Sequence, residues 1–205
     1  ALLARLDKFA KADVEILITG PSGVGKELYA AYTHEHSPRC AAPLVRVKCS
    51  NLGSNILENE LLGHGRGAYT GAHSAMGGIA SAADGGSLFL DEIETLQPMS
   101  QAKLLRFIQT KEYRRLGETT LRRADIRFIA ASNANLEELV RAGRFREDLY
   151  FRLRVVPIRI KPLAERREDI EPLLDHFAQR YAAEYDLPRV GLSARARRCL
   201  MAYCW

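Results

Sequence analysis

One stretch decides how the chain folds: Gly20-Pro21-Ser22-Gly23-Val24-Gly25-Lys26-Glu27. It follows the apolar run 14–18 and precedes helix-forming residues 27–35, so we expect a strand, a glycine loop and a helix. The spacing is that of a phosphate-binding P-loop. Glycines let backbone N–H groups turn toward an anion, the helix directs its positive end to the same point, and Lys26 adds a charge for the terminal phosphates. The alternative, a glycine turn with an incidental lysine, is disfavoured by the strand and helix around it.

A second motif, Gly85-Gly86-Ser87-Leu88-Phe89-Leu90-Asp91-Glu92, delivers two adjacent carboxylates at the end of an apolar strand. With a P-loop upstream, their roles separate: Asp91 holds magnesium, and Glu92 orients and activates the attacking water. Glu27 stands where a P-loop usually places Ser or Thr on the magnesium ion, and a carboxylate is also a good ligand, directly or through water. Together the two motifs predict a site that hydrolyses a nucleoside triphosphate.

Composition limits the class of protein. Of the 205 residues, 47% are hydrophobic, which suffices for one core, or for one core and a small annex. The net charge of +5 is spread along the chain and suits subunit interfaces or a polyphosphate ligand as well as nucleic acid. The four cysteines form no C-x-x-C pair, and no apolar run is long enough to span a membrane. We therefore expect a cytoplasmic protein with reduced, mostly buried thiols.

The remaining apolar periodicity predicts an α/β body, a five-stranded parallel sheet between helices. The expected strands are residues 14–19, 44–48, the run that ends at Asp91, 126–131 and 155–160. The expected helices are residues 1–12, 27–35, 54–62, 99–111 and 136–142, followed after Pro162 by 167–185 and 193–203. We divide the chain into an α/β nucleotide-binding subdomain, residues 1–162, and a partial helical lid, residues 163–205.

Polar residues end two of these strands. In open α/β sheets, ligands bind at the carboxyl ends of strands, so Lys48 and the pair Ser132-Asn133 are expected near the nucleotide. Asn133 can touch the terminal phosphate or the attacking water. The pattern leaves two alternatives open: Lys48 as a solvated strand-end lysine, and Asn133 or Asn135 as a helix cap.

Residues 63–72 hold four glycines around one aromatic side chain, Tyr69. This composition predicts a mobile loop with a hydrophobic tip, and loops of this length are usually functional. A plain surface loop is the alternative.

Taken together, these motifs resemble the central AAA+ ATPase domain of bacterial sigma-54-dependent transcriptional activators, the enhancer-binding proteins, over nearly the whole chain. Gly67-Ala68-Tyr69-Thr70-Gly71-Ala72, here called the hexapeptide loop, is similar to the family's GAFTGA loop with Tyr in place of Phe. The Lys-Glu end of the P-loop, the strand before Asp91-Glu92 and the segment 145–153 (FREDLYFRL) also match.

The resemblance implies a ring, commonly a hexamer, with ATP and Mg²⁺ between subunits. Lys26, Asp91 and Glu92 would act in one subunit, and Arg146 and Arg152 would be arginine fingers that reach the neighbour's γ-phosphate. In other phosphoryl-transfer systems such a finger supplies about 10³–10⁵ in rate, so a monomer would hydrolyse ATP poorly.

The resemblance to this family also implies a partner, the sigma-54 RNA polymerase holoenzyme. Tyr69 and Thr70 at the tip of the hexapeptide loop would touch sigma-54, and hydrolysis would move this loop and remodel the closed promoter complex. Ser132 and Asn133 match the sensor I region. DNA binding would belong to a C-terminal domain, and the sensor II arginine is expected beyond Trp205.

Three residues depart from the family's pattern. Pro21 replaces a Glu, Ala164 replaces an Arg, and Lys48 stands where the family usually has the Asn that holds the catalytic glutamate until the partner is engaged. We hypothesise that Lys48 forms a buried ion pair with Glu92 and alters basal hydrolysis or its coupling to sigma-54.

Two rival functions remain. A nucleotide-binding AAA+ scaffold with little turnover is favoured by Lys48 and by the incomplete lid. An AAA+ unfoldase is disfavoured by the hexapeptide loop, because a pore loop there would be expected to be shorter. Nothing in the chain resembles a helix-turn-helix.

Overall fold

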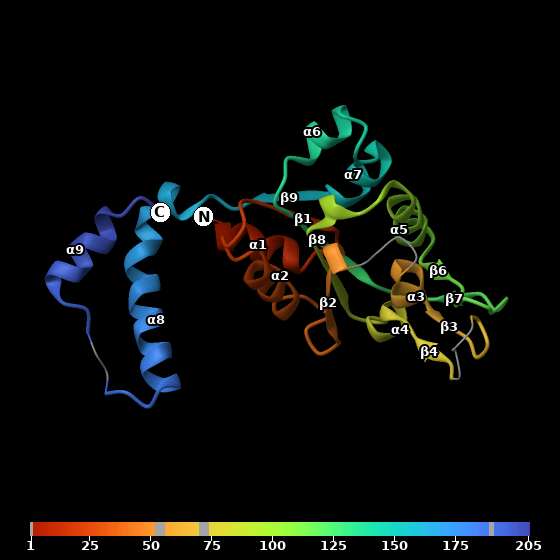
Figure 1. Ribbon diagram of the computed structural model, residues 1–205, viewed down its shortest axis with the longest axis horizontal. Coiled ribbons are helices and arrows are strands. Elements are labelled where there is room, and N and C mark those ends of the chain that lie inside the picture. Colours follow the sequence, from red (N-terminus) through yellow and green to blue (C-terminus); the bar gives the residue numbers. More distant parts are fainter. Residues whose placement is uncertain (1, 52–55, 70–73, 189–190) are drawn as a thin grey trace. The chain divides into compact units, whose positions relative to one another are not determined.

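The computed structural model describes residues 2–51, 56–69, 74–188 and 191–205. The chain forms two compact units, Ala1–Arg159 and Ile160–Trp205, each of which is considered by itself. The first unit is a wholly parallel five-stranded sheet with helices on both faces (Figure 1). The predicted α/β fold with a five-stranded parallel sheet is therefore confirmed.

The order of the strands across the sheet is β2-β5-β8-β1-β9. Their bounds are β1 Ile16–Thr19, β2 Leu44–Lys48, β5 Ser87–Asp91, β8 Arg127–Ser132 and β9 Val156–Arg159. The strand β1 lies between two partners, so that Ile16 is paired with Ile129 on one side and with Val156 on the other. Central strands are covered on both faces, which explains the apolar runs in the middle of β5 and β8.

Helices cover the two faces in separate groups. On one face, α1 (Leu2–Ala10) packs against α2 (Lys26–Glu35), and α2 contacts β1, β5 and β8. The other face carries α5 (Pro98–Thr110), α6 (Leu136–Arg141) and α7 (Glu147–Leu153), which pack on one another (Figure 1). Because all five strands are parallel, their carboxyl ends share one edge, and the P-loop leaves β1 at that edge.

Several short elements were not predicted. The strands β3 (Gly63–His64) and β4 (Met76–Gly77) form an antiparallel stem beneath the hexapeptide loop, between α3 (Ile56–Leu62) and α4 (Ile79–Ala82). A second ribbon joins β6 (Glu112–Tyr113) to β7 (Arg122–Arg123), in a segment where no strand was expected. Single 3₁₀ turns occur at Cys49–Asn51, Ile93–Thr95, Leu163–Glu165 and Arg167–Asp169. Two-residue strands are too short to show a period in the sequence.

The second unit contains the two predicted C-terminal helices, α8 (Ile170–Glu184) and α9 (Ala194–Ala202). Arg197 of α9 pairs with Glu171 at 2.7 Å and with Asp175 at 2.8 Å, both on α8. Within the described part of the chain, none of the helices has the length and apolar character needed to cross a bilayer. The prediction of mostly buried thiols is wrong, because Cys49 is buried whereas Cys40, Cys199 and Cys204 are exposed.

Candidate functional site

The P-loop wraps the start of α2, as its spacing predicts. Gly25 has φ 96°, in the left-handed region that favours glycine, and Lys26 is the first residue of the helix. The Lys26 side chain is buried, and its Nζ donates hydrogen bonds to the carbonyl oxygens of Gly20 (2.9 Å) and Pro21 (2.8 Å) and to the Asn133 side-chain oxygen. Burial lowers the pKa of Lys26, against the raising effect of the Asp91, Glu94 and Glu92 carboxylates.

The two carboxylates lie at the same edge. Asp91 ends β5, and its Oδ1 accepts a hydrogen bond from the Glu92 backbone N–H at 2.9 Å. Glu92 has φ 53°, a strained conformation for a residue other than glycine, and such strain is concentrated at functional sites. A hydrogen bond from Ser50, followed by the Lys48 ammonium group, holds the pKa of Glu92 below its ordinary value.

The ion pair between Lys48 and Glu92 is confirmed, with 3.1 Å between Nζ and Oε1. Its expected burial is wrong, because the side chain of Lys48 is 52% exposed and that of Glu92 21% exposed. Lys48 ends the edge strand β2, where water reaches the ammonium group. Lys48 therefore holds Glu92 through a partly solvated ion pair, in which water can replace either partner.

Two residues of the site were missed by the sequence reasoning. Ser50 contacts Glu92, and Glu94 Oε1 accepts a hydrogen bond from the Asn133 backbone N–H at 3.0 Å. Glu94 thereby ties the turn after β5 to the end of β8, next to Lys26. The signal for Glu94 was a third carboxylate two positions after Glu92, whereas Ser50 carries no signal in the sequence.

The two expected magnesium ligands, Asp91 and Glu27, differ in how well their surroundings suit the ion. Mg²⁺ in nucleotide sites is usually held by one or two carboxylates together with phosphates and waters, so Asp91 at the end of β5 fits this role. Glu27 is 62% exposed and forms an ion pair with Arg46 of β2 at 3.3 Å, a partner that it would have to release. The described residues contain no group of three or more His, Cys, Asp or Glu side chains arranged for a metal.

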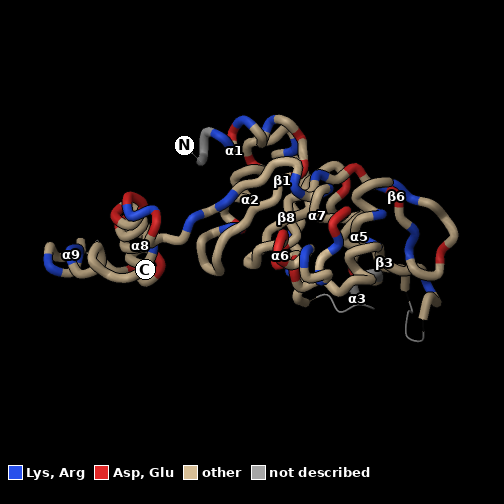
Figure 2. Tube along the Cα trace, turned by 90° about the horizontal axis from the view of Figure 1, so that it is seen from above, with Lys and Arg blue, Asp and Glu red and all other residues tan. Residues whose placement is uncertain are grey.

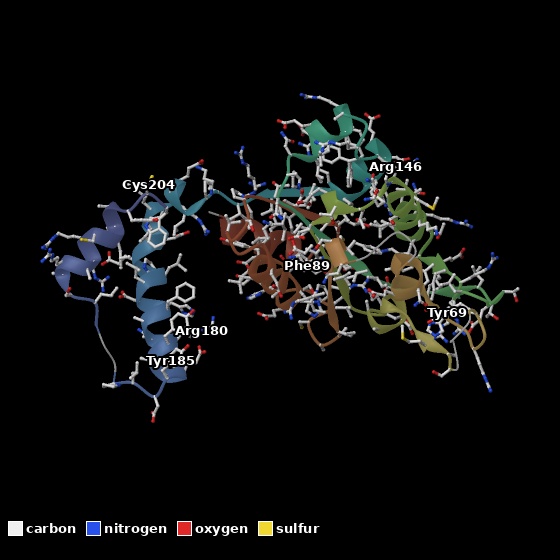
Figure 3. All side chains as sticks on the ribbon, viewed as in Figure 1. Tyr69, Phe89, Arg146, Arg180, Tyr185 and Cys204 are labelled. Atoms are coloured by element: carbon white, nitrogen blue, oxygen red, sulfur yellow. The ribbon has the colours of Figure 1, made fainter. Side chains whose placement is uncertain are left out.

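The two arginines expected to be fingers lie at opposite ends of α7. Arg146 precedes the helix and pairs with Asp148 at 2.8 Å, and Arg152, near its end, lies 3.8 Å from Glu15. Both side chains are nearly half exposed, and Figure 3 shows Arg146 at the start of α7. Within the described residues neither arginine forms an ion pair with the carboxylates of its own P-loop site.

The hexapeptide loop is described as far as Tyr69; Thr70, Gly71 and Ala72 lie outside the described residues. Tyr69 is 48% exposed, and its ring meets the edge of the buried His64 ring at 5.1 Å between centroids. The His64 ring is held in turn by Asn59, 2.7 Å from Nδ1. The strands β3 and β4 therefore present Gly67, Ala68 and Tyr69 from a hydrogen-bonded stem.

An open cavity of about 490 Å³ adjoins the P-loop at Gly20 and Pro21. Its wall includes Asn133 and, from α7, Tyr150, whose hydroxyl donates to Glu137 at 2.8 Å. Burial, and secondly this hydrogen bond, raises the pKa of Tyr150 to about 12, so the phenol stays neutral. The cavity provides space beside the phosphate-binding loop.

A glycine loop that opens a helix, an acidic pair at the end of a neighbouring strand and a parallel sheet of this order define a P-loop NTPase fold. Comparison with known proteins gives the particular family. Residues 1–159 match the family described as "Sigma-54 interaction domain", and residues 164–205 match the "AAA+ ATPase lid domain". The chain belongs to the sigma-54 interaction domain family, as the resemblance of its motifs predicted.

Individual relatives agree with this assignment. The chain is 48% identical over 205 residues to the alginate biosynthesis transcriptional regulatory protein AlgB of Pseudomonas putida, covering 100% of this chain and 46% of that protein. It is 46% identical over 200 residues to the transcriptional regulatory protein XylR of Pseudomonas putida, covering 98% of this chain and 35% of XylR. NtrX from Brucella abortus, solved in complex with ATP, superposes with a TM-score of 0.89 at 34% identity, over 100% of this chain and 46% of NtrX. The chain thus spans about half the length of these relatives, or less.

Proposed function

We propose that this chain binds ATP with Mg²⁺, hydrolyses it in a ring of identical subunits, and uses the hexapeptide loop to remodel the sigma-54 RNA polymerase closed complex. The observation that carries the proposal is the convergence of Lys26, Asp91, Glu92 and Asn133 at one edge of the sheet. Membership of the sigma-54 interaction domain family and the ATP complex of NtrX support it. The partner would be found in the bacterial cytoplasm.

Binding would begin with the exchange of partners at Lys26. Its Nζ now donates to the Gly20 and Pro21 carbonyl oxygens, and β- and γ-phosphate oxygens would replace these neutral acceptors with charged ones. Backbone N–H groups from Ser22 to Gly25 would face the same phosphates. Asp91 would hold Mg²⁺, which supplies charge neutralisation on the phosphate oxygens.

Hydrolysis would depend on Glu92. Ser50 and Lys48 keep its carboxylate ionised. Once the ion pair with Lys48 opens, this carboxylate can accept a proton from the attacking water. Asn133, fixed through its backbone by Glu94, would orient the γ-phosphate or the water. The water would lose this proton as its oxygen bonds to the γ-phosphorus. The bond between the γ-phosphorus and the oxygen that bridges to the β-phosphate would break in the same step.

Arg146 and Arg152 would complete the site of the next subunit. Both are exposed, Arg146 just before α7 and Arg152 near its end, and each is engaged with a nearby carboxylate that a neighbour's γ-phosphate could replace. A site completed in trans makes turnover depend on assembly, and a hexamer is the expected ring. The hexapeptide loop would contact sigma-54, and DNA would be bound by a separate C-terminal domain.

The test is ATP hydrolysis measured against protein concentration. The rate per subunit should rise steeply with concentration. It should fall about 10²–10⁴-fold in Glu92→Gln, which loses the base, and at least about 10³-fold in Arg146→Ala, which loses the finger. Arg144→Ala, an exposed arginine two positions earlier, is the matched control and should keep its rate.

A flat, negligible rate with tight ATP binding would contradict this proposal and favour the second candidate, an AAA+ scaffold with little turnover. The ion pair between Lys48 and Glu92 is the observation that favours this candidate, because it occupies the catalytic carboxylate. A rate that responds further to added sigma-54 would support the activator over the scaffold.

A further inference from the structure

One side chain inside the first unit contacts two segments on which the proposed function depends. Gln101 of α5 is fully buried, with 0% of its surface exposed. Its Nε2 donates hydrogen bonds to the carbonyl oxygens of Leu96 (2.8 Å) and Arg144 (3.0 Å), and its Oε1 accepts one from the Arg146 backbone N–H at 2.8 Å. These bonds hold the two segments firmly, because a buried polar group that loses its partner is strongly destabilised.

The segment on one side of Gln101 ends at the expected finger. Arg146 is the N-cap residue of α7, so its N–H lies outside the hydrogen bonds of that helix. The N–H groups of Arg144 and Phe145 both donate to the Leu139 carbonyl oxygen of α6, at 2.9 and 3.2 Å. The chain is therefore fixed by α6 as far as Phe145. Gln101 fixes the next residue, from which the guanidinium group extends.

The segment on the other side is the turn that follows the expected base. Glu92 is the N-cap residue of the 3₁₀ turn Ile93–Thr95, and Leu96 comes directly after this turn. The Glu92 carbonyl oxygen accepts hydrogen bonds from the Thr95 N–H (2.9 Å) and hydroxyl (2.8 Å). Gln101 thus joins the turn that begins at Glu92 to the start of α7, and α5 and α7 lie side by side in both views (Figure 1 and Figure 2).

We propose that Gln101 is a positioning residue for the arginine finger Arg146. The inference rests on the proposed function, since it requires Arg146 to act on the nucleotide of a neighbouring subunit. Because Gln101 is fully buried, it acts by holding the backbone from which the finger extends. Such a group works only within a narrow range of positions, and a misplacement of about 1 Å can lower a rate about 10²-fold.

Gln101→Met tests the proposal in the full-length protein. Methionine is unbranched and apolar, and its thioether cannot donate a hydrogen bond and accepts one only weakly. The kcat for ATP should fall about 10–10²-fold, while the Kd of a non-hydrolysable ATP analogue should change less than about twofold. Gln101→Asn, whose amide is one methylene shorter, is the second variant, and the same results are expected of it if Gln101→Met fails to fold.

Ser100→Ala is the matched control on the same helix. Ser100 is buried, and among the described residues its hydroxyl has no hydrogen-bond partner. The variant therefore removes a buried polar group of α5 without releasing the start of α7. Both kcat and Kd should stay within about twofold of their values in the unaltered protein.

Hydrogen exchange reports on the finger segment without nucleotide. The Arg146 N–H is bonded to a buried acceptor and should exchange slowly in the unaltered protein. In Gln101→Met, mass spectrometry should show faster exchange in the peptide that contains this N–H, whereas peptides from the central strand β8 should exchange as before. An equal acceleration in β8 would mean that the glutamine only stabilises the fold, which would overturn the proposal.

Mixed rings separate an effect on the finger from an effect on the subunit's own site. Glu92→Gln loses the base but keeps its finger, and Gln101→Met keeps its base and P-loop. In a ring, each subunit meets the next one head to tail, so an equimolar mixture should recover about a quarter of the unaltered rate, the share of interfaces that pair an intact base with an intact finger. Arg146→Ala mixed with Glu92→Gln is the positive control and should recover to the same level.

The outcomes distinguish this inference from the proposed function. If mixing rescues Arg146→Ala but not Gln101→Met, then Gln101 acts on its own subunit's site, and the inference is wrong while the proposed function stands. If mixing rescues neither variant, the fingers do not act on a neighbouring subunit, and the proposed function itself fails. An unchanged kcat in Gln101→Met would also overturn the inference.

Discussion

At residue 92, a carboxylate on a left-handed backbone meets a lysine from the neighbouring strand. The parallel register places Lys48 opposite Asp91, so the residue after Asp91 is within reach of the Lys48 side chain. A polar but uncharged side chain at position 48 would hold Glu92 by a hydrogen bond alone. The ammonium group adds a Coulomb attraction that solvent screens only in part, because half of the lysine side chain is covered.

Replacing Lys48 by Asn should therefore release Glu92 more readily and raise the basal rate of ATP hydrolysis severalfold. Lys48→Arg keeps the charge and is the matched control, which should leave the basal rate near that of the unaltered protein. Steady-state turnover with and without sigma-54 is the measurement. If Lys48→Asn and the unaltered protein hydrolyse ATP at the same rate, both with and without sigma-54, the ion pair has no part in controlling hydrolysis.

Among the elements, the turn between β6 and β7 lies against Ala68 at the start of the hexapeptide loop. Gly117 in this turn has φ +75°, and a Cβ atom added there would lie 2.9 Å from Cα and Cβ of Ala68. The turn is braced by Glu118, which pairs with Arg122 at 2.9 Å and with Arg115 at 3.9 Å. Any enlargement of residue 117 must push Ala68, and with it the base of the loop.

Gly117→Ala should lower sigma-54-dependent open-complex formation by more than about tenfold, while ATP turnover falls less than about twofold. Gly85→Ala is the matched control: its φ is +76°, but an added Cβ meets nothing within 4 Å. Both variants carry a similar backbone cost of about 1 kcal/mol, and displacement of Ala68 adds to this cost in Gly117→Ala, so thermal unfolding should shift at least as far in that variant. Equal open-complex formation in the two variants would rule out a steric effect on the loop.

The elements that the sequence predicted are those with a strong local signal. The strands β1, β5 and β8 each contain an uninterrupted apolar run because helices cover both faces, and the P-loop spacing is specific. The ribbons β3–β4 and β6–β7 escaped prediction because they are formed by pairing between segments, which no local period reports. At the site, the structure brings Lys26 into contact with Asn133 and places Asp91 at the end of β5. The half-exposed state of Lys48 depends on β2 being an edge strand, and that is set by the strand order.

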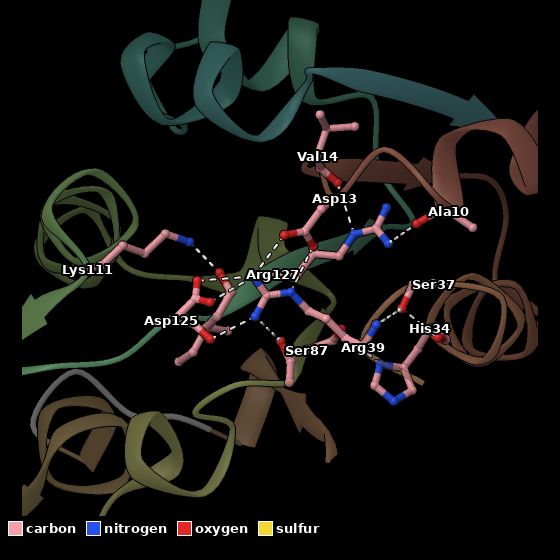
Figure 4. A network of polar contacts seen from close by, with 12 residues as sticks. Ala10, Asp13, Val14, His34, Ser37, Arg39, Ser87, Lys111, Asp125 and Arg127 are labelled. Atoms are coloured by element: carbon pink, nitrogen blue, oxygen red, sulfur yellow. Dashed lines mark hydrogen bonds and ion pairs between the residues drawn. The ribbon is translucent and has the colours of Figure 1, made fainter. Parts of the chain in front are cut away.

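Across the whole first unit, the amino ends of the strands are joined by a charged network (Figure 4). Arg39 pairs with Asp13 at 2.8 Å and with Asp125 at 3.0 Å. The buried Arg127 donates to the carbonyl oxygens of Ala10, Phe9 and Val14, so α1 is fastened to β8. This network lies at the opposite edge of the sheet from the P-loop and stabilises the fold rather than the nucleotide site.

The network predicts a dependence of stability on pH. A hydrogen bond from Arg39 holds the pKa of Asp13 below its ordinary value of 3.8, so the carboxylate's contribution is complete above pH 3.8 and is lost as pH falls through the folded-state pKa. Asp13→Asn should therefore lower the free energy of unfolding near neutral pH by about 0.5–1 kcal/mol, a modest figure because the side chain is 40% exposed.

Urea unfolding at neutral pH and in steps below pH 4 is the measurement. The difference between the unaltered protein and Asp13→Asn should shrink as the solution is acidified. Glu35→Gln changes an exposed carboxylate outside the network and should behave as the unaltered protein at every pH. A difference that stays constant down to pH 2 would show that the Asp13 charge contributes nothing.

The position of β1 in the sheet also bears on how the protein is made. Its hydrogen-bonded neighbours are β8 and β9, so Ile16 pairs with Ile129 and Val156, more than 100 residues later in the chain. During synthesis, the apolar strand that carries the P-loop emerges before β8 and β9, and it stays unpaired until those two strands have been made. Pairing between residues far apart in the sequence slows folding, and until it occurs the apolar strand stays exposed and prone to aggregation. We therefore expect chaperones to bind β1 of a nascent chain until β8 emerges, and a fragment that ends before β8 to be prone to aggregation.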